Sequence, residues 1–204
     1  MCTLPRLRTL RVVARGLWRN EDPDIADLTT SDDEGSEDED EEWDRYERAL
    51  GSLHITSLDM VYTSIPPAFP PILRHLSIQA PWTASGEIAN LSGLTHLTSL
   101  ELSHCVTPVD TELLAPLVNL EALVMTDNPR PSLLPLAHLT RLTSLDLTGM
   151  YEGADGVALP DGLAALTALK SLNVSDIPNL KGAHEFFRSM SSHTECTLTN
   201  TTCV

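Results

Sequence analysis

The sequence predicts an α/β repeat solenoid in which one parallel β-strand and one short helical turn recur about every 23 residues. Three observations predict it. Leucine supplies 34 of the 204 residues, the leucines return in one frame, and that frame spaces them by 3, 3, 3 and then 2 residues. A spacing of three suits a turn of α- or 3₁₀-helix, whereas a spacing of two is the period of a strand. Because one such unit cannot bury its apolar face alone, we expect stacked units that share one core.

Four regular copies of this frame follow one another in the centre of the chain. In order they are Leu91, Leu94, Leu97, Leu100 and Leu102; Leu114, Leu117, Leu120, Leu123 and Met125; Leu136, Leu139, Leu142, Leu145 and Leu147; and Leu163, Leu166, Leu169, Leu172 and Val174. The last two members of each copy predict a strand, and the earlier members predict a helical turn that precedes it.

Less regular copies extend the array in both directions. Two precede the centre, at Ile55–Ile65 and Leu73–Ile78, and the prolines of IPPAFPP between them predict an extended connection instead of a helical turn. A further copy lies at each end, with frame residues Leu7, Leu10, Val12 and Leu17 and frame residues Phe187, Met190, His193, Cys196 and Leu198. We therefore expect about seven or eight units.

The units divide the chain into four parts. Residues 1–19 are expected to form a poorly capped first repeat, 50–181 the regular repeats, and 182–204 a degenerate carboxyl-terminal cap. A leucine frame that starts at residue 7 without a polar cap predicts either a frayed first strand or a longer native chain. Residues 20–49 are the fourth part, an acidic disordered insertion or loop.

The central copies resemble the leucine-rich repeat family, whose pattern is L-x-x-L-x-L-x-x-N/C-x-L. Cys105 and Asn128 match its Asn/Cys position, and the next two units place Met150 and Ile177 there, apolar side chains that could fill an inward-facing site. The resemblance implies a horseshoe with a concave parallel sheet and short helical or 3₁₀ turns on the convex side. It covers nearly all of the chain outside residues 20–49.

Most of the formal net charge of −16 lies in residues 20–49, which hold fifteen Asp and Glu against two Arg. The run SDDEGSEDEDEE at 31–42 is too polar to offset the entropy of ordering. A solvated loop and a docking tail for a basic partner both remain open for it. Ser31 and Ser36 each precede a glutamate by three positions, which makes them candidate phosphorylation sites that would add further negative charge.

Several function classes are excluded or disfavoured by what the sequence holds. A pI near 4.6 has the wrong sign for direct binding of nucleic acid. The sequence contains no run of 18 apolar residues, which a membrane-spanning helix would need, and it contains no evident secretion signal. We therefore expect a cytoplasmic monomer with reduced cysteines; the cytoskeleton, the ciliary axoneme and the nucleus stay open as locations. Because no nucleotide loop, activated nucleophile or paired metal-ligand motif occurs, we expect no enzyme activity, no cofactor and no metal.

The resemblance implies that a protein partner is recognised by the concave sheet. The side chains between and beyond the frame leucines are mostly small, polar and mildly acidic, which favours a basic partner. An alternative is an ordinary solvated surface without a ligand. The candidate partner-binding residues are Asp59, Tyr62, Glu101, His104, Val124, Asp127, Asp146, Asn173 and Asp176.

The predicted function is accordingly a non-enzymatic protein–protein interaction module or scaffold, with the acidic loop as a secondary electrostatic contact. Two alternatives place the same face in a larger system. One is the recognition part of a longer intracellular immune or signalling receptor, and the other is a substrate-selecting subunit of a ubiquitin ligase.

Overall fold

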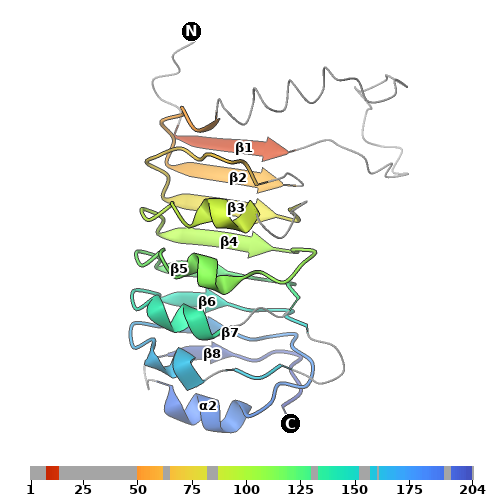
Figure 1. The fold of residues 1–204 in the computed structure, drawn as a ribbon. Helices are drawn as coiled ribbons and strands as arrows, with labels where there is room; N and C mark the ends of the chain where they lie inside the picture. The colour runs from red at the N-terminus through yellow and green to blue at the C-terminus, as the bar shows by residue number, and fades with distance from the viewer. Residues whose placement is uncertain are drawn as a thin grey trace, which may run out of the picture.

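The computed structural model describes residues 8–13, 50–61, 65–81, 87–129, 133–151, 157–159, 161–190 and 194–203. Within these residues, parallel strands form one open eight-stranded sheet, and each strand pairs with the next one along the chain (Figure 1). The strands are β1 Thr9–Val13, β2 Ser57–Val61, β3 His75–Gln79, β4 Ser99–Ser103, β5 Ala122–Val124, β6 Ser144–Asp146, β7 Ser171–Asn173 and β8 Glu195–Thr197. The predicted parallel solenoid is confirmed.

Short helices cover one face of this sheet, in front of the strands in Figure 1. They are the 3₁₀-helices η1 Glu87–Leu91, η2 Thr111–Leu114, η3 Leu134–His138 and η4 Asp161–Ala165, and the α-helix α2 Ala183–Ser189. Asp110 caps η2, because its Oδ1 accepts a hydrogen bond of 3.1 Å from the Glu112 amide. Residues 65–73 contain no helix, as the prolines of that segment predict.

The frame leucines form the core between the sheet and the helices. Strand pairing aligns the first leucine of each strand, so that Leu100 pairs with Leu123, Leu123 with Leu145, and Leu145 with Leu172. These four side chains are buried to within 1% of completely. Each unit contributes its leucines to one continuous apolar layer, as stacking of repeats requires.

A second row of inward-facing residues lies three positions after the last frame residue of each strand; we call it the turn position. Asn128 occupies it in the middle of the array and is completely buried. Its Nδ2 donates to the Leu102 carbonyl at 2.6 Å, and its Oδ1 accepts from the Cys105 amide at 2.8 Å. Thr201 does the same for the preceding unit with its Oγ1, which donates to the Val174 carbonyl at 2.7 Å and accepts from the Ile177 amide at 3.5 Å.

Apolar residues at the other turn positions are compatible with the backbone around them. Cys105 stands next to Pro81, the turn residue of the preceding unit, and proline has no amide that needs an acceptor. Next to Ile177, the Met150 amide donates directly to the Leu147 carbonyl at 3.3 Å, which closes that turn without a side chain. The polar row is therefore discontinuous because the backbone satisfies itself at the apolar positions.

Some predicted features lie outside the described residues. These are Tyr62, the candidate phosphorylation sites Ser31 and Ser36, and the whole of segment 20–49. In the part of the chain that the structure describes, no helix combines the length and the apolar composition that crossing a bilayer requires.

Candidate functional site

The concave face carries the side chains that point away from the helices. Strand pairing aligns the residue between the two frame positions of every strand into one row across the sheet, which we call the middle column. From β1 to β8 it consists of Arg11, Asp59, Ser77, Glu101, Val124, Asp146, Asn173 and Thr197. The structure thus brings five of the predicted partner-binding residues into one line, namely Asp59, Glu101, Val124, Asp146 and Asn173.

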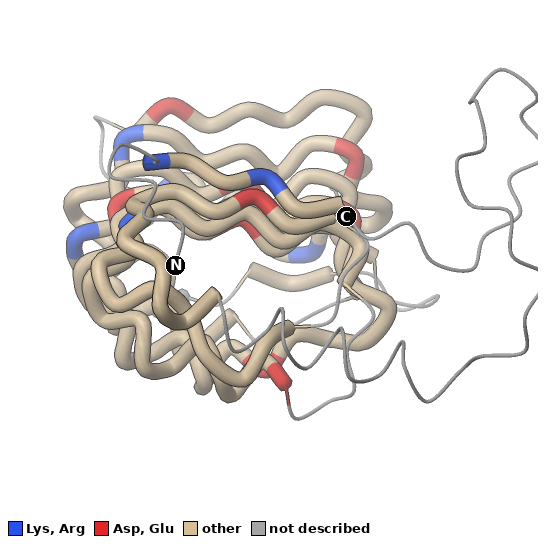
Figure 2. The backbone as a smooth tube through the Cα atoms, turned by 90° about the horizontal axis from the view of Figure 1, so that it is seen from above, with Lys and Arg blue, Asp and Glu red and all other residues tan. Residues whose placement is uncertain are grey.

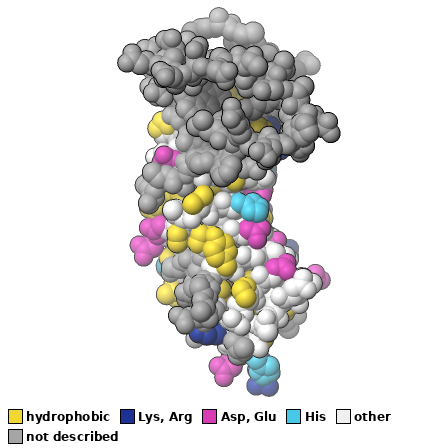
Figure 3. All heavy atoms as spheres, turned by 90° about the vertical axis from the view of Figure 1, so that its right-hand side faces the viewer, with side chains coloured by type: hydrophobic (Ala, Val, Ile, Leu, Met, Phe, Trp, Pro, Cys, Tyr) yellow, Lys and Arg dark blue, Asp and Glu magenta, His cyan; other side chains and the backbone are white. Residues whose placement is uncertain are grey.

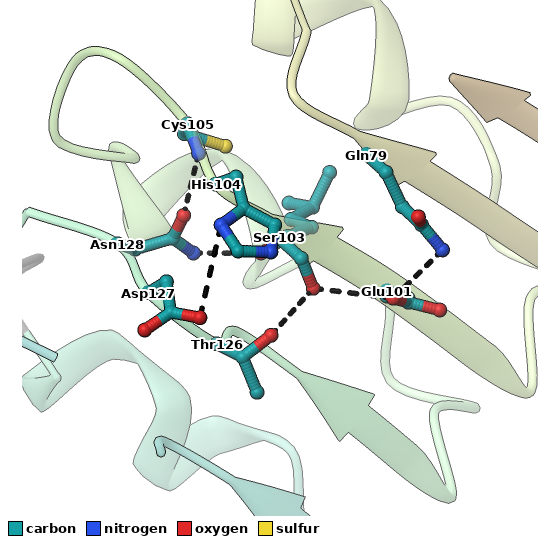
Figure 4. Close-up of polar contacts among 9 residues, drawn as sticks. Gln79, Glu101, Ser103, His104, Cys105, Thr126, Asp127 and Asn128 are labelled. Carbon is teal, nitrogen blue, oxygen red and sulfur yellow. Dashed lines mark hydrogen bonds and ion pairs between the residues drawn. The ribbon is translucent and has the colours of Figure 1, made fainter. Parts of the chain in front are cut away.

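The Glu101 carboxylate on β4 is held by donors from two strands. Ser77 Oγ donates to Oε2 at 3.0 Å, and Gln79 Nε2 donates to Oε1 at 3.2 Å, both from β3. Ser103 Oγ also donates to Oε1 at 3.2 Å, and it accepts a bond of 2.8 Å from Thr126 Oγ1 (Figure 4). We call these five residues the Glu101 cluster.

The Asp146 carboxylate on β6 is fixed in a similar way. Its Oδ1 accepts from the Thr148 amide at 2.9 Å and from Thr148 Oγ1 at 2.5 Å, and its Oδ2 accepts from Asn173 Nδ2 at 3.2 Å. Asn173 Oδ1 in turn accepts from Ser175 Oγ at 2.7 Å, and Ser175 Oγ accepts from the Thr199 amide at 3.0 Å. We call these residues the Asp146 cluster.

Val124 on β5 separates the two clusters. Its side chain is half-buried and pairs in register with Glu101 on one side and Asp146 on the other. Neighbouring strands lie about 4.8 Å apart, so β4 and β6, which carry the two carboxylates, are roughly 10 Å apart across the sheet. The centre of the concave face is therefore an apolar patch between two oriented carboxylates.

Within the described residues, neither carboxylate has a cationic partner. The described residues contain three ion pairs, Arg11–Asp59 at 3.1 Å, His104–Asp127 at 3.7 Å and Arg141–Glu121 at 3.2 Å, and none includes Glu101 or Asp146. Hydroxyl and amide donors orient a carboxylate without cancelling its charge. Asp59, by contrast, already has Arg11 beside it.

Three other candidates lie beyond the ends of the strands, and they do not line the middle column. His104, Asp127 and Asp176 have left-handed backbones with φ of 57°, 53° and 57°, at the position where Gly149 has φ 68°. They form the edge of the sheet at which strands end, which we call the carboxyl edge. His104 Nδ1 lies 3.7 Å from Asp127 Oδ2 (Figure 4).

The carboxyl edge also exposes apolar side chains. Val106 is 74% exposed and Tyr151 50% exposed. Figure 3, which views the molecule from this side, shows hydrophobic side chains gathered next to histidine and acidic side chains. This surface is distinct from the middle column, because it is formed by the turns that follow the strands.

Apart from Ser77, which lies in the middle column, the hydroxyl-bearing residues of both clusters are residues that the sequence prediction missed. They occupy one position, directly after the second frame residue of each strand, and they are Ser103, Thr126, Thr148, Ser175 and Thr199. Their recurrence in five consecutive units is the signal that would have identified them.

Burial disfavours the thiolate form of the two cysteines near the site. Burial raises the pKa of the Cys105 thiol to about 11, so it stays protonated at neutral pH. Burial also raises the pKa of Cys196. Among the described residues, no three His, Cys, Asp or Glu side chains gather closely enough to hold a metal ion.

No protein-family model and no curated protein matches the sequence. Solved structures do match. Internalin C2 from Listeria monocytogenes is 21% identical with a TM-score of 0.54, over 75% of this chain and 74% of that chain. The leucine-rich-repeat ectodomain of the receptor kinase GASSHO1/SCHENGEN3 from Arabidopsis thaliana, solved in complex with CASPARIAN STRIP INTEGRITY FACTOR 2, is 21% identical with a TM-score of 0.52, over 73% of this chain and 19% of that chain.

These neighbours confirm the predicted fold class. The chain has a fold like that of leucine-rich-repeat proteins, an open horseshoe sheet with short 3₁₀ turns on its convex side. The match spans three quarters of internalin C2 but only about a fifth of the plant ectodomain.

Proposed function

We propose that this chain is a non-enzymatic protein-interaction module whose concave face binds a basic segment of a partner protein. The observation that carries the proposal is the pair of carboxylates Glu101 and Asp146, each fixed by neutral donors and neither in an ion pair among the described residues. A Lys or Arg side chain of a partner would meet an acceptor that is already oriented, which lowers the entropy cost of binding. Charge-assisted hydrogen bonds are also stronger than neutral ones.

The form of the face favours a polypeptide as the ligand. The two strands that carry the carboxylates are roughly 10 Å apart with Val124 between them, a span that two basic side chains of one polypeptide can bridge around an apolar contact. Phosphate groups of a nucleic acid would be repelled by the same carboxylates. The plant ectodomain, which shares the fold, is itself solved with a bound factor.

Segment 20–49 adds a second, electrostatic contribution to this proposal. Its fifteen acidic residues give the chain a long-range negative field. Such a field raises association rates with a basic partner more than it raises affinity. We place this interaction in the cytoplasm.

The test is a titration of the full chain with a synthetic peptide that carries several arginines, measured by calorimetry. We expect Glu101→Gln and Asp146→Asn each to weaken binding about tenfold, which corresponds to about 1.4 kcal/mol and to one lost charge-assisted hydrogen bond.

Glu112→Gln is the matched control, because Glu112 is exposed on η2 of the convex side and its substitution removes the same charge. An equal loss in Glu112→Gln would show that net charge alone attracts the peptide. Unchanged affinity in both concave-face variants would overturn the proposal.

A further inference from the structure

The edge of the sheet at which strands begin differs in charge from the rest of the molecule. Five exposed basic or histidine side chains lie there in the first four units; they are Arg8, His54, Arg74, His75 and His96, and we call them the basic edge. In Figure 2, which looks down the solenoid, Lys and Arg gather mainly on the left, where the strands of Figure 1 begin. This surface lies on a chain whose formal net charge is −16.

Backbone hydrogen bonds align the members of the basic edge. The Thr56 amide donates to the Arg8 carbonyl at 2.9 Å, the Arg74 amide to the Thr56 carbonyl at 2.9 Å, and the Thr98 amide to the Arg74 carbonyl at 2.8 Å. These four residues therefore hold the same position in consecutive units. Arg8 and Arg74 lie two strands apart, about 10 Å.

Hydroxyl groups lie between the basic side chains. Thr56 and Thr98 alternate with the two arginines, and their Oγ1 atoms are fixed on the Arg8 carbonyl at 3.4 Å and the Arg74 carbonyl at 3.2 Å. His75 is flanked in register by Ser57 and Ser99. Guanidinium groups, protonated imidazoles and the hydroxyls of Ser57 and Ser99 can donate to carboxylates, whereas the Thr56 and Thr98 hydroxyl protons are already donated to backbone carbonyls.

Within the described residues, no carboxylate pairs with the arginines of the basic edge. Neither Arg8 nor Arg74 belongs to any of their three ion pairs. Farther along the same edge Arg141 and Glu121 pair with each other at 3.2 Å, so that part is neutral. Lys170, which lies in the same row beside β7, is exposed and is also outside these ion pairs; the other two such cations of the row, Arg8 and Arg74, both lie beside the first four strands.

The chain itself holds a segment of complementary chemistry. Nine of the twelve residues 31–42 are Asp or Glu, and Glu42 stands eight residues before Leu50, which is anchored in the core at 1% exposure. Eight extended residues span at most about 29 Å. His54, four residues after Leu50, is already part of the basic edge. The sequence thus tethers the acidic run next to this edge, at an effective concentration in the range of about 1 mM.

We propose that the basic edge binds the acidic segment 31–42 of the same chain. The binding surface consists of Arg8, His54, Arg74, His75 and His96, which take no part in the concave-face clusters. The proposal therefore stands or falls separately from the proposed function. It also predicts competition, because a basic partner that engages the acidic segment must displace it from this edge.

A spin label tests this proposal in the full chain. Ser36→Cys provides the attachment site, combined with Cys2→Ser, Cys196→Ser and Cys203→Ser; Cys105 is buried and its pKa is raised to about 11, which protects that thiol from labelling at neutral pH. We expect loss of amide proton signal at Arg74, His75 and Thr98 at low salt. The signal should return at about 0.5 M NaCl, where the Debye length falls to about 4 Å.

Two controls make the result decisive. The double variant Arg8→Gln, Arg74→Gln should restore the amide signals, whereas Arg188→Gln, an exposed arginine on α2 at the other end of the solenoid, should not. The second control is a mixture of two chains, one isotope-labelled without a spin label and the other spin-labelled without isotopes. The isotope-labelled chain should show no signal loss, because the contact is within one chain. Full signals at Arg74 and His75 at low salt, or a loss that the double variant leaves unchanged, would overturn the proposal.

Discussion

The centre of the solenoid and its first strand use the same leucine frame but bury it to different degrees. Leu145 on β6 is 1% exposed and has β5 and β7 on its two sides. Leu10 on β1 is only partly buried, and among the described residues β1 pairs with β2 alone. Because a repeat contacts only its neighbours, the position of a unit in the array determines how much its leucines stabilise the fold.

The largest expected difference in the free energy of unfolding is between Leu→Ala substitutions in the centre and in the first strand. Leu145→Ala should lower the free energy of unfolding by about 2–5 kcal/mol, since it leaves a cavity between two packed units. Leu10→Ala should cost less than about 1 kcal/mol, because its side chain is only partly removed from water in the folded state.

Denaturant titrations of the two variants, compared by midpoint at equal m-values, measure the difference. Equal losses would mean that β1 is packed as tightly as the centre, and would remove the contrast between the two regions.

Polar residues at the turn position also differ in burial between the centre of the array and its last unit, and we expect a smaller difference in stability there. Asn128→Val leaves the Leu102 carbonyl and the Cys105 amide without partners in a dry interior, and we expect a cost of about 2–4 kcal/mol. Thr201→Val removes the equivalent two hydrogen bonds in the last unit. Thr201 is partly exposed, so water can replace them, and we expect a cost of about 1 kcal/mol.

Thermal unfolding of both variants gives the comparison. If Thr201→Val lowers the stability as much as Asn128→Val does, burial does not determine how much these two side chains stabilise the fold.

Much of this contrast could be predicted from the sequence, because the leucine frame encodes it directly. The spacing places Leu145 in a strand of the regular centre and Leu10 in the first unit. The same alignment predicts the middle column, since a residue between two buried strand positions must face the other side of the sheet. Asp59, Glu101 and Asp146 follow from that rule alone.

What the frame does not contain is the geometry after each strand. His104 and Asp127 were expected along the strands, but each lies in a left-handed turn just beyond a strand end. Gly149, at the equivalent position of the next unit, is the strongest sequence signal for that conformation, and the Asp, Asn and His residues at the other equivalent positions are weaker ones. The contacts of Glu101 were equally hidden, because Gln79 reaches it from another strand through its side-chain conformation.

The smallest expected difference in the free energy of unfolding is between alanine substitutions at two glycines. It tests how closely neighbouring units approach at the carboxyl edge. Gly149 and Gly182 have similar left-handed backbones, with φ of 68° and 65°. A Cβ at Gly149 would lie 2.0 Å from Asp127 Oδ1, whereas a Cβ at Gly182 would meet nothing within 4 Å. Alanine at either position should cost about 1–2 kcal/mol for the backbone alone.

Gly149→Ala should cost up to about 1 kcal/mol more, because the half-exposed Asp127 carboxylate must rotate away. A double-mutant cycle with Asp127→Ala isolates this term by measuring the unfolding free energies of both single variants and the double variant. We expect the excess to disappear in the double variant. If it persists without Asp127, the backbone of the neighbouring unit, and not its side chain, sets the requirement for glycine at position 149.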